Sequence, residues 1–206
     1  MGHASTPEFQ TFHALRIKGF ATVDTLVEMT TQPKSEVEAQ LGSFAESSQV
    51  QFRENRGLWQ LTPDGRAAHT DLLAADLAGI EAAQVLGTHY EPFVEINVGF
   101  KELCSEWQLR DGAPNDHSDA EYDAGVVARL AELNAAAQPV VAAMGVEIDR
   151  LSPYAPRLEA TLTRVQAGEN SMFTGVMCGS FHDVWMELHE DLILTQGIDR
   201  AAEGSF

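Results

Sequence analysis

The 206-residue sequence predicts a mainly α-helical protein with one short β-hairpin in its first third. Along most of the chain apolar residues recur every three or four positions, the spacing of helices that bury one face. The runs QVQFRE and LWQLT instead alternate apolar and polar residues, and Asn55, Arg56 and Gly57 separate them. Asn and Gly accept the positive φ of tight hairpin turns, so these two runs are expected to pair as antiparallel strands.

Three helices are expected before this hairpin. Thr6 suits the N-cap of the first helix, which should end at Gly19, and Thr22 suits the N-cap of the second. Residues 33–47 have the spacing of a third helix, with a proline in its first turn. Helices followed by a hairpin are the parts of a winged helix-turn-helix with a two-stranded wing. The predicted first domain, residues 1–87, is this unit with a linker helix.

The outward face of the third helix and the turn of the hairpin carry the candidate DNA contacts. Amide, hydroxyl and cationic side chains read base edges, and cations also contact phosphates. The candidates are Lys34, Ser35, Gln40, Ser43, Arg53 and Arg56. Glu36 and Glu38 would lie close to phosphates, so a solvated or protein-binding helix face is an equal alternative. For the two arginines, a plain solvated turn is an equal alternative.

The net charge limits how this protein could bind nucleic acid. Thirteen Lys and Arg stand against 31 Asp and Glu, which gives −18 at pH 7. Six of the cations and eight of the acids precede residue 70, so the remainder of the chain carries most of the negative charge. A field of this sign repels nucleic acid at long range. Any DNA contact must therefore come from a local patch near the N-terminus.

The second predicted domain, residues 88–206, is acidic and all-helical, and it should serve in dimerisation, ligand sensing or docking. A linker helix over 66–87 is expected to precede it, with packing inside one chain or a dimer contact as equal alternatives. Pro92 should begin the next helix. The remaining helices are expected over about 122–144, 148–165 and 178–196, with Gly197 as the last cap.

Two groups of side chains are candidate contacts for a ligand or partner. The first lies in and before the polar segment 110–123 and consists of Trp107, Arg110, Asn115, Asp116 and His117. Ser118 and Glu121 there have the spacing of a capping box, which is the favoured explanation of this segment.

The second group lies on the last helix and consists of His182, Trp185 and His189. The two histidines are two helical turns, roughly 10 Å, apart, so one ion cannot easily join them and no metal site is expected. Glu187 and Asp191 on the same helix are expected to form a solvated stripe.

Cys104 and Cys178 have apolar neighbours and no CxxC spacing, which predicts two buried thiols in a reducing cytoplasm. The N-terminus lacks a secretory signal pattern, and no segment is apolar enough to span a bilayer. Phosphate-binding loop, nucleophile elbow, HExxH and dinucleotide motifs are missing. Neither a cofactor nor catalysis by this chain is therefore expected.

Two family resemblances add to these expectations. The strings LRIKGFATVDTLVEMT, PKSEVEAQLGSFAES and GLWQLTPDGR resemble the winged-helix domain of MarR-type transcriptional regulators. That likeness covers the first third of the chain, and it implies a DNA-binding, ligand-responsive homodimer.

The whole chain, including WQLRDGAPNDHSDAEYDA and FHDVWMELHEDL, also resembles small winged-helix proteins that accompany dikinase-like enzymes using phosphoenolpyruvate. This implies either a regulator of that pathway or a non-catalytic subunit of a large kinase similar to phosphoenolpyruvate synthase or phenylphosphate synthase. The string Gly-Ser-His-Ala, which would carry a phosphoryl-accepting histidine, does not occur in the sequence.

Overall fold

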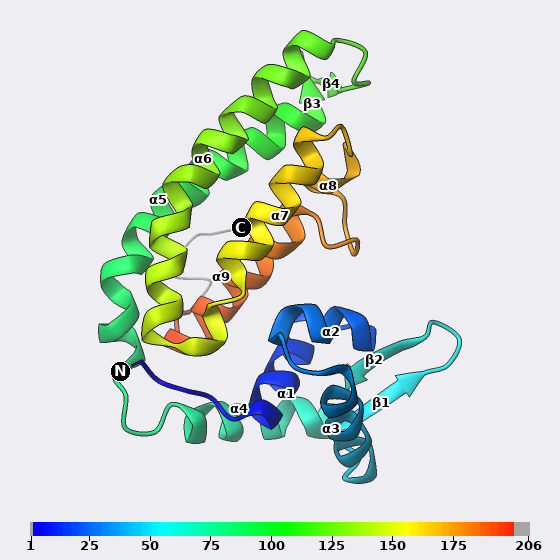
Figure 1. The fold of residues 1–206 in the computed structure, drawn as a ribbon, viewed down its shortest axis with the longest axis vertical. Helices are drawn as coiled ribbons and strands as arrows, with labels where there is room; N and C mark the ends of the chain where they lie inside the picture. The colour runs from blue at the N-terminus through cyan, green and yellow to red at the C-terminus, as the bar shows by residue number, and fades with distance from the viewer. Residues whose placement is uncertain (1, 200–206) are drawn as a thin grey trace.

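The computed structural model describes residues 2–199 and is mainly helical, with 70% of residues in helices and 8% in strands (Figure 1). This confirms the predicted fold class at the level of a mainly α protein with a small antiparallel sheet. The elements are α1 (Pro7–Lys18), α2 (Val23–Thr30), α3 (Lys34–Glu46), β1 (Val50–Arg53), β2 (Leu58–Leu61), α4 (Pro63–Asp76), α5 (Ala82–Gln108), β3 (Leu109–Arg110), β4 (Ala113–Pro114), α6 (Ala120–Glu147), the 3-10 turn η1 (Asp149–Leu151), α7 (Tyr154–Gln166), α8 (Ser171–Thr174) and α9 (Phe181–Gln196).

The first five elements and α4 form an N-terminal unit with its own core. Its fully buried side chains include Leu15, Leu26 and Leu41, contributed by α1, α2 and α3. The side chains of Thr6 and Thr22 accept hydrogen bonds from the first turns of α1 and α2, which confirms both predicted caps. Local capping and one shared apolar core therefore fix three short helices at defined angles.

The predicted hairpin is also confirmed. Strands β1 and β2 pair in antiparallel register from Val50 opposite Leu61 to Arg53 opposite Leu58. Gly57 in the turn has φ +65°, a conformation that a glycine adopts without steric cost. The backbone of Ala21, between α1 and α2, bridges to Trp59 of β2 on its outer side, with N–H···O distances of 3.0 and 2.8 Å. The hairpin is thereby tied to the helices.

The elements from α5 to α9 form a second, helical unit. Helices α5 and α6 run side by side along its length, and α7 and α9 pack against them (Figure 1). Its core includes the fully buried Phe93, Leu130 and Trp185, one from each of α5, α6 and α9. The short β3–β4 hairpin, which the sequence did not predict, closes the α5–α6 connection at the far end of the molecule (Figure 1).

Several predicted helix boundaries are wrong. The helices expected over 148–165 and 178–196 begin later, at Tyr154 and Phe181. The expected helix over 66–87 is interrupted between α4 and α5, where Gly79 has φ +88°. Pro92 lies inside α5 and does not begin it, because Leu86, Phe93 and Phe100 bury one continuous face whose packing outweighs one lost hydrogen bond. The predicted division after residue 87 consequently falls within α5.

The two units meet along α1. Helix α1 packs against α4, α3 and α2 on its own side and against α9 of the helical unit on the other. Ahead of α1, His3 joins the turn after α6, where its N–H donates to Glu147 O and its carbonyl accepts from Asp149 N–H. Helix α3 and the β1–β2 hairpin lie on the outer side, away from the helical unit (Figure 1).

Among residues 2–199, every helix is too short or too polar to cross a membrane.

Candidate functional site

The outer face of α3 presents three of the predicted DNA contacts to solvent. Lys34, Ser35 and Ser43 are exposed. Lys34 Nζ donates to Asp24 Oδ1 at 2.8 Å, and this hydrogen bond raises the pKa of the Lys34 ammonium. Because both side chains of that pair are more than half exposed, the lysine can exchange Asp24 for another anion at little cost.

Gln40 differs from the prediction. Its side chain is only half exposed, and its Nε2 donates at 3.0 Å to Gln32 Oε1. Gln32 is itself buried, and its Nε2 donates to Pro7 O and Thr11 Oγ1. Gln40 therefore completes a hydrogen-bonded chain that joins α3 to α1, and it is not free to read a base. The expectation that it faces outward is wrong.

The hairpin turn presents both predicted arginines to solvent. Arg53 and Arg56 border a shallow hollow of about 260 Å³ together with Phe20, Asn55 and Gln60. Backbone hydrogen bonds from Arg56 and Gly57 to Arg53 O, both 2.9 Å, hold the turn. Two guanidinium groups, one at the end of β1 and one in the adjoining turn, are suited to contact phosphate groups.

The acidic residues of α3 share its exposed surface. Glu36, Glu38 and Glu46 are all exposed, and Lys34 is the single cation of this helix. The α3 face by itself thus has a net negative charge. Attraction to a polyanion depends on the hairpin, whose turn carries Arg53 and Arg56 against Glu54.

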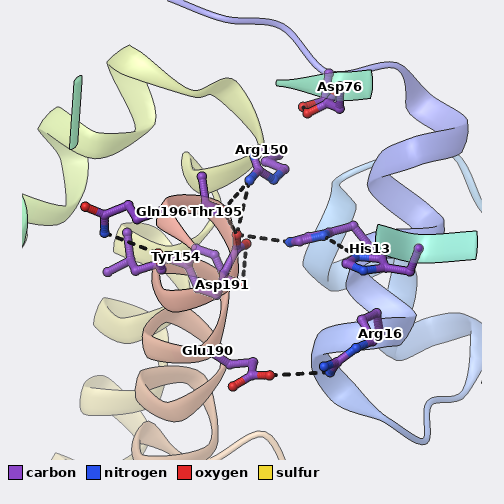
Figure 2. Close-up of polar contacts among 12 residues, drawn as sticks. His13, Arg16, Asp76, Arg150, Tyr154, Glu190, Asp191, Thr195 and Gln196 are labelled. Atoms are coloured by element: carbon purple, nitrogen blue, oxygen red, sulfur yellow. Dashed lines mark hydrogen bonds and ion pairs between the residues drawn. The ribbon is translucent and has the colours of Figure 1, made fainter. Parts of the chain in front are cut away.

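A second cluster, which the sequence analysis missed, lies buried where the two units meet (Figure 2). His13 Nδ1 is 2.9 Å from His69 Nε2, and His13 Nε2 is 3.0 Å from Asp191 Oδ1. Tyr154 OH donates to Asp191 Oδ2 at 3.1 Å, and Thr195 Oγ1 donates to Asp191 Oδ1 at 3.0 Å. All five side chains are buried. Side chains of α1, α7 and α9 thus meet at the Asp191 carboxylate, and His69 of α4 joins them through His13. We call these five residues with Arg150 the interface cluster.

Arg150 supplies a cation at this carboxylate. Its Nη2 donates to Thr195 Oγ1 and lies 3.4 Å from Asp191 Oδ1. Burial alone would raise the pKa of Asp191, but the nearby His13 and Arg150 and the hydrogen bonds from His13 and Thr195 lower it below its usual range. Asp191 therefore stays ionised although it is only 2% exposed.

Two further titratable members of the cluster, His69 and Tyr154, respond to the same environment. Burial, followed by the proximity of His13 and Arg16, lowers the pKa of His69 to about 3. Burial and the neighbouring Asp191 raise the pKa of the Tyr154 hydroxyl well above its ordinary value. His69 is consequently neutral and Tyr154 protonated at neutral pH, which matches the donor role of the Tyr154 hydroxyl.

Ion pairs continue the interface along α1 and α9. Lys18 Nζ lies 2.6 Å from Glu187 Oε1, and Arg157 Nη2 lies 2.7 Å from Glu187 Oε2. Arg16 Nη1 is 3.4 Å from Glu190 Oε1 (Figure 2). Two of the six cations in the first 70 residues are thus engaged between the units. Because Glu187 and Asp191 are both buried, the expectation that they form a solvated stripe is wrong.

The polar segment before α6 forms a structural network at the far end of the molecule. His117 Nδ1 lies 2.9 Å from Asp123 Oδ2, and its ring packs on the buried Trp107 with centroids 4.5 Å apart. The side chain of Asn115 donates to Trp107 O and to Asp123 Oδ1. Trp107 is therefore a core residue that anchors this segment and not an exposed contact.

The cap of α6 is not the predicted one. Asp119 accepts hydrogen bonds from the N–H groups of Glu121 and Tyr122, so Asp119 replaces Ser118 as the N-cap. Arg110 donates to Asp119 Oδ2 at 2.8 Å and stacks over the Tyr122 ring. Asp116 is exposed, and the hydrogen bonds from Ser118 lower its pKa.

On α9 the three candidate residues have different environments. Trp185 is fully buried and donates to Asn97 Oδ1 at 2.9 Å, so it is unavailable to a ligand or partner. His182 is half-buried and His189 is buried, and both border a hollow of about 430 Å³ beside α5. Burial lowers the pKa of His182. Across residues 2–199, no three His, Cys, Asp or Glu side chains gather closely enough to hold a metal ion.

The cysteines only partly match the prediction. Cys104 is half-buried in the same hollow, and burial raises the pKa of its thiol to about 12, so it is a poor nucleophile at neutral pH. Cys178 is exposed, which contradicts its expected burial, because it lies on the loop between α8 and α9 and not on a helix face. Both are free thiols.

Comparisons of the chain with family models, with curated proteins and with solved structures find no match in any of the three. The two family resemblances noted in the sequence stay predictions.

Proposed function

We propose that the N-terminal unit is a winged helix-turn-helix and that the protein is a DNA-binding transcriptional regulator. The observation that carries this proposal is the placement of Lys34, Arg53 and Arg56. All three are exposed, on α3 and the hairpin, and these elements face away from the helical unit. The Ala21–Trp59 bridge also supports it, since it adds a short third strand to the two-stranded wing.

In this proposal α3 is the recognition helix, with Ser35 and Ser43 facing base edges and Lys34 facing a phosphate. The hairpin is the wing, and its two arginines contact the phosphate backbone or minor groove. Three cations in one chain give a weak nucleic-acid site. A two-fold symmetric homodimer would double them, and such symmetry is common among oligomers. A protein with this role would act in the cytoplasm.

A salt titration with matched variants tests the proposal. Fluorescence anisotropy would follow the binding of a labelled duplex from the neighbouring promoter. The salt concentration would be varied from about 50 to about 200 mM, because affinity that depends on phosphate contacts falls steeply over this range. The double variant Arg53→Ala/Arg56→Ala should lose about tenfold or more in affinity. The slope of log affinity against log salt should fall by about 2, one unit per lost phosphate contact.

The control removes two arginines from the helical unit. Arg129 and Arg164 are about half exposed and pair with Glu106 and Glu169, so Arg129→Ala/Arg164→Ala changes net charge equally without touching the proposed wing. This control should bind DNA like the wild type. Equal affinity of both double variants, or no salt-dependent binding by the wild type, would refute DNA binding through the wing.

A second function is favoured by the acidic face of α3. Glu36, Glu38 and Glu46 outnumber Lys34 on that surface, which suits a basic protein partner better than a duplex. In that case the chain is a non-catalytic accessory subunit of a large kinase that uses phosphoenolpyruvate, docked through the winged helix. Co-purification with such a subunit, combined with loss of kinase activity when this chain is removed, would establish the accessory role.

A further inference from the structure

The hollow beside the hairpin turn combines one aromatic ring with two cations and two amides. Its volume is about 260 Å³, and it is lined by Phe20, Arg53, Asn55, Arg56 and Gln60. All five lining residues are neutral or cationic, although the whole chain has 31 acids against 13 Lys and Arg. The hollow is therefore locally positive on an otherwise anionic protein, and it should attract an anionic group.

The two arginines of this hollow are accessible and available to a ligand. In the part of the chain that the structure describes, neither Arg53 nor Arg56 forms an ion pair, and both side chains are exposed. By contrast, the exposed Arg164 of the helical unit pairs with Glu169. A guanidinium group matches the geometry of a phosphate with two parallel N–H donors. Two unpaired guanidinium groups at one hollow therefore suit a phosphate better than any other anionic group of a nucleic acid-sized partner.

Backbone geometry holds Phe20 beside the hairpin. Helix α1 ends at Gly19, whose φ is +78°, and Ala21 exchanges two backbone hydrogen bonds with Trp59 of β2. Phe20 is thereby fixed between the end of a helix and a strand, and it remains 37% exposed. A partly exposed aromatic ring beside cations is the combination found in sites for single-stranded nucleic acid, where the ring stacks on a base and the cations contact the backbone.

Phe20 also borders a second hollow, on the side of the helical unit, and the two hollows differ in charge. The second one contains Asp183 and Glu187, whose carboxylates lie 3.7 and 2.6 Å from Lys18 Nζ. Lys18 is thus already compensated there, and two carboxylates repel a further anion. A ligand that carries a phosphate and contacts Phe20 is therefore favoured on the side of the hairpin.

We propose that the hairpin hollow binds one unpaired nucleotide of a DNA strand, with its base stacked on Phe20 and its phosphates at Arg53 and Arg56. The amides of Asn55 and Gln60 face the edge of that base. The hollow is smaller than the usual small-molecule pocket of about 300–1,000 Å³, so it suits one unit of a longer chain better than a free ligand. The inference rests on the proposed function in that both use the same two arginines, and it adds Phe20 and a single-stranded substrate.

Two labelled DNA probes separate this inference from duplex binding. One is a blunt-ended duplex, and the other is the same duplex with a short single-stranded thymine overhang. In fluorescence anisotropy at one salt concentration, the wild type should bind the overhang probe about fivefold or more tightly, the size of effect that one base–aromatic stack gives. Equal affinity for both probes overturns the inference and leaves duplex binding intact. Binding of the overhang probe alone supports the inference and refutes the duplex proposal, and binding of neither refutes both.

Matched aromatic variants locate the stacking surface. Phe20→Leu keeps an apolar side chain but removes the ring, so it should abolish the preference for the overhang and leave the affinity for the blunt duplex unchanged. Phe20→Trp retains a stacking ring and should keep the preference. The control is Phe52→Leu, because Phe52 is 46% exposed, packs on Trp59 and lies on the opposite face of β1 from Arg53. A preference that survives Phe20→Leu, or that Phe52→Leu abolishes equally, overturns the proposal.

Discussion

Charged side chains occur in this protein in two contrasting settings. At the interface between the units, Asp191, Arg150 and His13 are almost completely removed from water and bonded to one another. On the outer face of the N-terminal unit, Lys34 and Asp24 form an ion pair of 2.8 Å whose two side chains are more than half exposed to solvent. Water screens the outer pair, but it cannot compensate a lost partner in the inner cluster. The interface therefore contributes to stability, and the outer face leaves its charges available for binding.

Removal of one carboxylate from each setting should give the largest contrast. Asp191→Ala leaves Arg150 and His13 buried without their shared acceptor, and it should lower the free energy of unfolding by about 3–5 kcal/mol. Asp24→Ala removes the exposed partner of Lys34 and should change that free energy very little. Urea unfolding followed by circular dichroism measures both. Similar losses in the two variants would show that the buried cluster has no special energetic role.

Acid should affect the interface before it affects the outer face. Burial and the neighbouring His13 and Arg16 lower the pKa of His69 from 6.5 to about 3. The unfolded chain therefore binds a proton at His69 between those pH values and the folded chain does not. The contribution of His69 to the free energy of unfolding is therefore fully present above about pH 6.5. It falls by about 1.4 kcal/mol per pH unit as the pH drops toward 3.

The lowered pKa of Asp191 adds a loss in the same direction, which begins only below the ordinary pKa of an aspartate. Urea unfolding of the wild type and of His69→Gln between pH 4 and 7 isolates the histidine contribution. The variant should be less stable at pH 7 and should show a shallower dependence on pH. Parallel pH profiles would contradict the assignment to His69.

The features that could be predicted from the sequence are those that neighbouring residues determine. The caps at Thr6 and Thr22 and the turn at Gly57 depend on side-chain and backbone chemistry within a few positions. Pro92 shows how such local rules fail, because distant packing of α5 overrides the preference of proline to begin a helix.

The interface cluster could not be predicted in the same way. His13 and Asp191 are 178 positions apart, and neither belongs to a motif. The available signal was weak: Glu187, Asp191 and Thr195 recur every four residues on α9, which places them on one side of that helix. Polar residues at this spacing are usually solvated. The side of α9 that carries Asp191 is an interior surface only because α1 of the other unit packs against it.

The smallest expected effects concern two glycines of the N-terminal unit that lie on the outer elements. Gly42 is helical, exposed and free of contacts that an added Cβ would meet, so Gly42→Ala should raise the free energy of unfolding by about 0.5–1 kcal/mol. Gly57 has φ +65° in the hairpin turn, and Gly57→Ala should lower it by about 1 kcal/mol. Urea unfolding resolves changes of opposite sign more easily than their absolute sizes. Neither substitution touches the interface cluster, so both variants should keep the wild-type dependence of stability on pH. A changed pH profile in either variant would mean that the outer face and the interface are coupled.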